Sequence, residues 1–297
     1  MHYSFVILHY MAVEDTLACV ASILSALGDE DYSLVVVDNG SPDGSGKRLL
    51  EEVGHHERVT ILIEKENLGF AQGNNVGFRH AKRINKADFV VMINNDTLLQ
   101  QKDFLRTIGT IYEETAFHVL GPDILSLVDG GHQNPPKGST MTKRTLQVSQ
   151  GLNTLYYGAS YLHLDRVAFR LVDGLYRLKA KGQKKGDPVK DEEITGVKEG
   201  VQLHGSALIF SPLYLEKHEG LYGETFMYME EDILFYLAKK TQMKMVYDPR
   251  IQILHKEDSS TKATFSSDVK RRRFKYKHHI HSAKVFLALM QKDHPEF

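Results

Sequence analysis

The sequence has a single cysteine, Cys19, no excess of either charge and no long apolar run. One cysteine cannot form an internal disulfide or a cysteine zinc site, and such sparse use fits a reducing compartment. The 37 basic and 38 acidic residues nearly cancel. No overall electrostatic field therefore favours nucleic acid, and we expect no nucleic-acid partner. No stretch approaches the roughly 18 apolar residues of a membrane-spanning helix.

The N-terminus also lacks the features of a secretion signal. Its apolar run covers only about eight residues, without a basic start or a small-residue cleavage site. We therefore expect the chain to begin with a β-strand and the protein to lie in the cytoplasm. At 297 residues, with 42% apolar and 25% charged, the composition is that of a globular protein with a sizeable core.

The first hundred residues alternate between short apolar runs and helical patterns. Apolar runs predict buried strands at 3–10, 33–39, 59–65 and 88–94, and the segments between them predict helices at 14–27, 47–53 and 67–83. Continuous apolar strands separated by helices favour a mainly parallel sheet covered on both faces. We therefore predict an α/β, Rossmann-like fold.

Beyond residue 100 the pattern loosens. It predicts a helix at 102–114, an irregular segment at 126–200, a strand leading into a helix at 201–218, a helix at 230–241, one or two strands at 243–256 and a helical tail. The Lys-rich stretch at 177–195 is expected to be a mobile loop. The tail carries seven Lys or Arg and no acidic residue within 270–284.

Two nucleotide-binding motifs are excluded. The "GSGK" after the second strand is similar to a phosphate loop, but Ser41 stands where that motif needs its first glycine, and Arg48 follows Lys47 in place of Ser or Thr. No Gly-x-Gly-x-x-Gly follows the first strand, so the dinucleotide-binding fingerprint is absent as well.

Two acidic residues end two of the predicted strands. Asp38 follows the second strand, and Asp96 follows the fourth in "FVVMINNDT". In open α/β sheets, ligands bind beyond the carboxyl ends of the strands. One acid could accept hydrogen bonds from a ribose or base, while the other holds Mg²⁺ or Mn²⁺ on substrate phosphates. The alternative is turn chemistry alone, because Asx turns are common at such positions.

At this point the sequence resembles a known family. The stretches "VVVDNGSPDGS", "NLGFAQGNNVGF", "VMINNDT", "HGSALIFSP", "FMYMEEDILFYLAKK" and "YDPRIQILHK" occur in the order and spacing of the family-2 inverting glycosyltransferases of the GT-A fold. Within that family they are similar to the rhamnosyltransferase-like branch of bacterial surface polysaccharide synthesis. The resemblance covers about residues 3–256, with the middle section poorly matched.

The resemblance implies transfer of a sugar, with inversion, from a UDP- or dTDP-linked donor to a glycan or lipid-linked acceptor. The nucleotide-sugar contacts that it implies are Tyr10, Asp38, Asn67, Gly69, Asn74 and Asn95. The metal ligands that it implies are Asp96 and His255, for Mn²⁺ or Mg²⁺. Asp96 is the only acid kept from the Asp-x-Asp motif, because Asn94 and Asn95 precede it. Metal dependence is therefore left open.

The resemblance also places the general base within "YMEEDILF". The family pattern is Glu-Asp-x-Asp-Leu, and alignment on Leu234 places the base at Glu231, with Glu230 before it and Ile233 in place of the second Asp. Alignment on the acidic pair nominates Asp232 instead. A helix dipole also favours acids in a first turn, which explains one or two of them without catalysis.

The acceptor side is assigned to His204 and Gly205 and to the variable segment 126–200. We divide the chain into a nucleotide-sugar-binding half (1–125), an acceptor-binding and catalytic half (126–265) and a basic amphipathic C-terminal helix (266–297). Residues 270–284 are expected either to pack as a solvated helix or to contact anionic membrane at its inner face. The competing function is a catalytically inactive partner subunit that binds nucleotide sugar.

Overall fold

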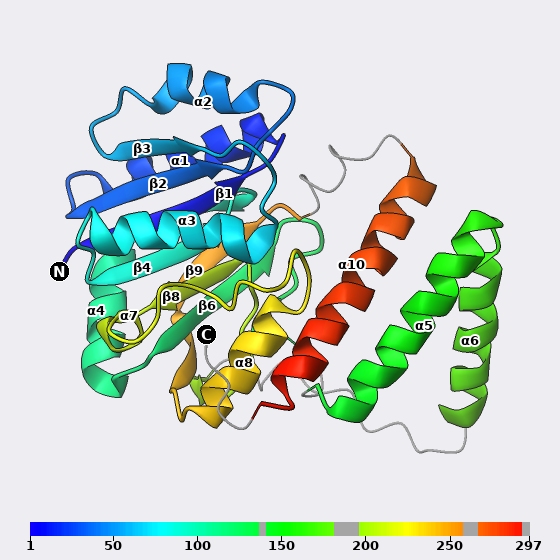
Figure 1. Ribbon diagram of the computed structural model, residues 1–297. Coiled ribbons are helices and arrows are strands. Elements are labelled where there is room, and N and C mark those ends of the chain that lie inside the picture. Colours follow the sequence, from blue (N-terminus) through cyan, green and yellow to red (C-terminus); the bar gives the residue numbers. More distant parts are fainter. Residues whose placement is uncertain (137–140, 181–195, 258–266, 293–297) are drawn as a thin grey trace.

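The computed structural model describes residues 1–136, 141–180, 196–257 and 267–292, the side chains of 175–180 excepted. The predicted mobile loop at 177–195 lies outside these ranges from residue 181 onward. A nine-stranded sheet forms the centre of the chain, with the strand order β3-β2-β1-β4-β8-β6-β9-β5 and with β7 paired to β9 (Figure 1).

The N-terminal half of the sheet is parallel, as the sequence predicts. Its strands are β1 (Tyr3–His9), β2 (Tyr32–Asp38), β3 (Val59–Ile63) and β4 (Phe89–Asn94), joined by helices α1 (Val13–Leu27), α2 (Ser45–Val53) and α3 (Phe70–Arg83). Because the strands run in one direction, their carboxyl ends meet at one edge of the sheet.

The other half of the sheet is mixed. It contains β5 (Thr97–Leu98), β6 (Val119–Ser126), β7 (Lys198–Glu199), β8 (Ala207–Phe210) and β9 (Met245–His255), with helices α4 (Phe104–Thr115), α7 (Pro212–Leu215) and α8 (Glu230–Lys240). Strand β8 runs antiparallel between β4 and β6, and β9 is one continuous strand whose pairing with β6 is irregular near Pro122.

Helices cover both faces of the sheet, which confirms the predicted layers. One apolar cluster joins the sheet to α1 and α4, and it includes Val20, Ile23, Phe104 and Ile108. A second cluster joins the opposite face to α3, α7 and α8 through side chains such as Phe78. Figure 1 shows α3 lying across β1, β2 and β4 on this face.

The prediction that 126–200 is irregular is wrong for much of the segment. It contains two long helices, α5 (Lys143–Tyr161) and α6 (Asp165–Ala180), and α5 packs beside the C-terminal helix α10 (Asp268–Leu289) (Figure 1). A capping box between Thr142 and Thr145 begins α5. Within α5 only Leu146, Tyr156 and Ser160 are buried. Such a narrow buried strip gives a weak helical pattern in sequence.

The predicted C-terminal helix is confirmed as α10. One side of it faces α5, and the other packs through Ala283, Phe286 and Leu289 against Ile233 and Leu237 of α8. Within the described ranges, the helices do not combine the length and apolar character that a membrane crossing needs.

Candidate active site

The first of the predicted donor-side residues lie where the parallel strands end. In register, His9 at the end of β1 lies opposite Asp38 at the end of β2, while Leu8 lies opposite Asn94 at the end of β4. The first strand therefore separates the two acidic strand ends that the sequence singles out. Tyr10 follows directly after β1 and is half-buried.

Asp38 is held by its own turn and by the start of α2. The Ser41 amide donates a hydrogen bond of 3.1 Å to Asp38 Oδ1, which is the Asx turn considered from the sequence. A Cβ on Gly46 would lie closer than 3.0 Å to the Asp38 carboxylate, so the glycine lets the first turn of α2 approach this group. Asp38 is 2% exposed.

The loop before α3 is shaped by side-chain amides. Asn39 Nδ2 donates to Asn67 Oδ1 (3.1 Å) and to the carbonyl of Gly69 (3.0 Å), and its Oδ1 accepts from the Leu68 amide (2.9 Å). Gly69 has φ +83°, and a Cβ there would collide with the backbone of Phe226. Glycine is therefore required at this crossing.

Three predicted donor contacts direct their amides into the protein. Asn67 Oδ1 accepts from the Gly69 amide (2.8 Å), and Asn74 Nδ2 donates to the Phe70 carbonyl (2.9 Å). Asn95 Nδ2 donates to Thr16 Oγ1 (3.0 Å) and is buried. These bonds favour a role in shaping the donor edge.

Asp96 and His255, distant in sequence, meet because β5 pairs antiparallel with β9. In that pairing Thr97 lies opposite His255. His255 Nε2 lies 3.2 Å from Asp96 Oδ1, while His255 Nδ1 bonds to Gln133 Oε1 at 2.8 Å. Both side chains are largely buried, with 8% and 10% exposed.

A carboxylate and an imidazole at this distance suit Mn²⁺ or Mg²⁺ only with additional oxygen ligands. Within the described ranges, no cluster of three or more His, Cys, Asp or Glu side chains could hold a metal ion. Asp96 and His255 could therefore hold a metal only if its remaining ligands came from a diphosphate and water.

Next to His255 lies the predicted acceptor side. The rings of His204 and His255 are 6.0 Å apart, and His204 Nδ1 bonds to Ser206 Oγ at 2.9 Å. Burial, aided by the neighbouring His255, lowers the pKa of His204 to about 4. This ring is therefore neutral at pH 7.

Gly205, in the turn before β8, lies against the start of helix α8. A Cβ on Gly205 would lie closer than 3.0 Å to three atoms of the Glu231 side chain. Burial raises the pKa of Glu231, and hydrogen bonds from the backbone, including that of Gly205, oppose the rise. Asp96, His255, His204 and Glu231 thus belong to one continuous set of contacts.

The three acids of α8 have different surroundings. Burial, together with the charge of Glu231, raises the pKa of Glu230 to about 8, and the Thr225 hydroxyl donates to it at 3.1 Å. Burial also raises the pKa of Asp232, opposed by a 3.0 Å bond from Gln202 Nε2. Glu230 is thus held as a neutral acid near pH 7, whereas Glu231 and Asp232 stay partly exposed.

The segment before α8 is held in place by α10. Tyr228 and Met229 have φ of 75° and 71°, a left-handed conformation that costs roughly 1–3 kcal/mol per non-glycine residue. The Tyr228 ring stacks on His279 with centroids 4.3 Å apart, and Ser282 Oγ donates to the Met227 carbonyl at 2.8 Å. Helix α10 therefore supports the start of α8, which carries the candidate base.

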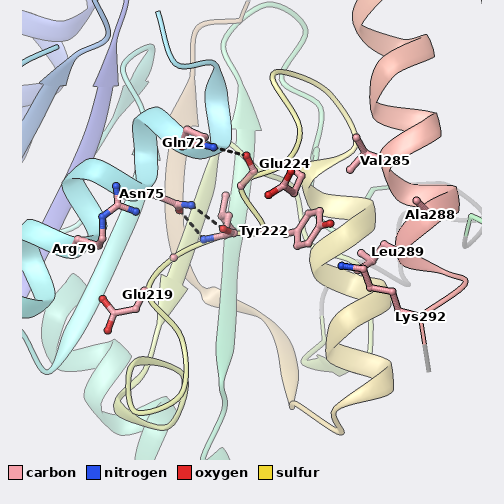
Figure 2. Close-up of a pocket in the computed structure, with 13 residues that line it drawn as sticks. Gln72, Asn75, Arg79, Glu219, Tyr222, Glu224, Val285, Ala288, Leu289 and Lys292 are labelled. Carbon is pink, nitrogen blue, oxygen red and sulfur yellow. Dashed lines mark hydrogen bonds between the residues drawn. The ribbon is translucent and has the colours of Figure 1, made fainter. Parts of the chain in front are cut away.

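A cavity of about 740 Å³ lies between α3, residues 219–224 and the end of α10 (Figure 2). None of the predicted site residues lines it. On its wall, Asn75 bonds both to the carbonyl and to the amide of Leu221 (2.7 Å each), and Gln72 Nε2 donates to the Gly223 carbonyl. Helix α3, which starts at the donor loop, thus also anchors the loop that leads into α8.

Sequence analysis missed the buried His9. Its Nδ1 lies 2.7 Å from Thr16 Oγ1 and its Nε2 lies 2.8 Å from Ser45 Oγ, so it joins α1 to α2 beneath Asp38. It also missed Asn39. The signal for Asn39 was its position directly after Asp38. For His9 there was no local signal, because its partners Thr16 and Ser45 are distant in sequence.

This arrangement of a mainly parallel sheet with helices on both faces defines a GT-A-like fold, as the sequence predicted. The model of Glycosyl transferase family 2 matches residues 4–170, more than half of the chain. The chain therefore belongs to glycosyl transferase family 2.

The chain is also similar to individual known proteins. The low-salt glycan biosynthesis hexosyltransferase Agl10 of Haloferax volcanii is 27% identical over 123 residues, which cover 41% of this chain and 36% of that protein. The match thus spans little more than a third of the relative's length.

Two solved structures of S. aureus TarS share the fold at 12% identity. The form comprising residues 1–349 has a TM-score of 0.51, with 98% of this chain and 74% of that chain covered. The other has a TM-score of 0.52, with 92% and 41% covered.

Proposed function

We propose that this protein is an inverting glycosyltransferase that moves a sugar from a UDP- or dTDP-linked donor to a glycan or lipid-linked glycan in surface polysaccharide or glycoconjugate synthesis. The observation that carries the proposal is the continuous set of contacts from Asp96 through His255 and His204 to Gly205 and Glu231. It joins a metal-diphosphate position to a carboxylate whose pKa is raised.

In the proposed mechanism Asp38 binds the nucleoside, and Asp96 and His255 would hold Mn²⁺ or Mg²⁺. When bound, the metal neutralises charge on the departing diphosphate. Glu231 takes the proton of the acceptor hydroxyl, whose oxygen bonds to the anomeric carbon as the bond to the diphosphate oxygen breaks on the opposite face. A positioned base of this kind contributes about 10²–10⁴-fold.

Glu231 is preferred over Asp232 as the base because of its contacts. The Asp232 carboxylate is engaged by the Gln202 side-chain amide, whereas the Glu231 carboxylate lies against the Gly205 backbone. A raised pKa strengthens a carboxylate as a base, and burial raises the pKa of both acids, so the preference rests on these contacts. Glu230, neutral at pH 7, is suited to holding Thr225 and the start of α8.

The test is thermal unfolding of the full chain with UDP, dTDP, GDP or ATP, each with Mn²⁺ or with EDTA. A ligand at 100 times its Kd adds about 2.7 kcal/mol to the free energy of unfolding, which raises Tm by several degrees. We expect a rise with UDP or dTDP that requires Mn²⁺. A rise with ATP alone would contradict the proposal. Nucleotide binding without any sugar transfer would favour the inactive partner subunit.

A further inference from the structure

The helical hairpin of α5 and α6 exposes an unusual amount of apolar surface. Among the described residues, eight of the fifteen exposed large apolar side chains lie on these helices and the turn between them. They are Val148, Leu155, Tyr161, Leu162, Leu164, Val167, Phe169 and Leu171. Scattered apolar side chains are normal on a protein surface, but a concentration on one hairpin indicates a binding surface.

Within this surface one stripe follows helical spacing. Val167 and Leu171 lie four residues apart on one side of α6, and Leu164 directly precedes the helix, three residues before Val167. Leu164, Val167 and Leu171 are 51%, 51% and 65% exposed. The exposed Arg166 and Arg170 each stand one residue before a member of the stripe, and Arg166 also pairs with Asp268 of α10 at 3.0 Å. An apolar stripe bordered by arginines is the pattern of a helix that lies in a lipid interface.

The basic end of α10 adjoins the same hairpin. Arg272 bonds to the buried Asp165 at the start of α6 (2.6 Å), and the Arg273 guanidinium lies 4.3 Å from the centre of the Tyr161 ring. The exposed Lys270 and Lys275 lie within one turn of these arginines on α10. Figure 1 shows the start of α10 beside the turn between α5 and α6. Because Arg272 is paired with Asp165, the positive charge that borders the hairpin there comes from Arg273, Lys270 and Lys275.

Positive charge is concentrated on α10, although the net charge of the whole chain is near zero. Residues 268–284 hold seven Lys or Arg against one acid, whereas the complete chain has 37 basic and 38 acidic residues. A symmetric contact between two copies would press the same basic patch against itself. An anionic surface is instead attracted by each cation and accepts the apolar stripe below its headgroups.

We propose that Leu162, Leu164, Val167 and Leu171, named here the hairpin surface, dock on an anionic lipid bilayer, with Arg166, Arg170 and Lys270 as their cationic border. Membrane contact was expected from the basic residues 270–284 alone. The proposal adds an apolar anchor on the α5–α6 hairpin. It does not depend on the proposed sugar transfer, because docking requires neither donor nor acceptor.

The test is co-sedimentation of the full chain with vesicles of phosphatidylcholine, with and without phosphatidylglycerol, at low and high salt. We expect binding to the anionic vesicles, weakened by salt. The triple variant L164S/V167S/L171S should lower the partition coefficient by about tenfold or more. The variant R166Q/R170Q/K270Q should lower it on anionic vesicles and abolish most of its salt dependence.

The matched control is L50S/I63S/I84S, which removes three comparably exposed apolar side chains, at 50%, 49% and 67%, from the parallel half of the chain. It should bind vesicles like the unchanged protein, and unfolding curves should show all variants folded. Equal binding by the control and the α6 variant would overturn the proposal, as would no binding to anionic vesicles. A dimer in light scattering that L164S/V167S/L171S dissociates would overturn it in favour of a second copy.

Discussion

The contact between Gly205 and Glu231 offers a direct test of the proposed base. In G205A the new Cβ would lie 2.8 Å from Glu231 Cδ and 2.9 Å from Cγ, and closer still to Oε1, where ordinary contacts begin at 3.4 Å. The carboxylate must move by about 1 Å to relieve this overlap, and a displacement of that size can lower turnover by about 10²-fold. The backbone bond from Gly205 would be disturbed as well.

The assay separates turnover from binding. Turnover is the release of UDP or dTDP from the donor sugar, with water in place of the acceptor hydroxyl until the glycan acceptor is identified. Nucleotide binding is followed by the shift in Tm. We expect G205A to lose turnover and to keep the Tm shift, because the donor-side residues Asp38 and Gly69 lie on other strands and loops.

A double-variant cycle makes the test specific. If Gly205 acts only by positioning Glu231, then G205A should cost nothing further in an E231Q background. The control is G158A, an exposed position in α5 where a Cβ meets no atom within 4 Å. Unchanged turnover in G205A, or losses that simply add in the double variant, would refute the assignment of Glu231 as the base.

Four further predictions follow from the site. E231Q should lower turnover by roughly 10²-fold or more with nucleotide binding intact, and a larger loss in D232N would move the role of base to Asp232. D96A should abolish the Mn²⁺-dependent part of the UDP-induced Tm shift; if that part persists, Asp96 only closes a turn. G46A should weaken UDP binding by about tenfold or more, because its Cβ displaces the Asp38 carboxylate, and an unchanged Kd in titration calorimetry would exclude a donor role for Asp38. Glu230 has a folded pKa of about 8 against an ordinary 4.5, so its contribution to stability is complete below pH 4.5 and is lost as pH rises to 8. Denaturant titrations should show a decline of up to about 1.4 kcal/mol per pH unit across that window, which E230Q should lack.

The strands and helices of the parallel half follow from local pattern. A continuous apolar run such as Phe89–Ile93 is unfavourable in water, so it must form a strand buried on both faces. The positions of these strands, and of the helices between them, were therefore predictable. The α5–α6 hairpin was missed because it lacks this degree of burial. Helix α5 buries only three side chains, and the apolar residues with helical spacing in α6, Val167 and Leu171, lie in solvent, so the sequence lacks the broad apolar face that a buried helix presents.

By itself, the sequence determined the fold class, the family and which acidic residues are candidates for the site, because strand ends and motif order are local properties. Only the tertiary structure decided which of them meet. Asp96 reaches His255 because β5 pairs with β9, and Gly205 reaches Glu231 because β8 brings its preceding loop to α8. The different surroundings of Glu230, Glu231 and Asp232 depend on burial and on partners such as Thr225 and Gln202. Long-range pairing and desolvation set these contacts and pKa values, and neither is encoded in the spacing of neighbouring residues.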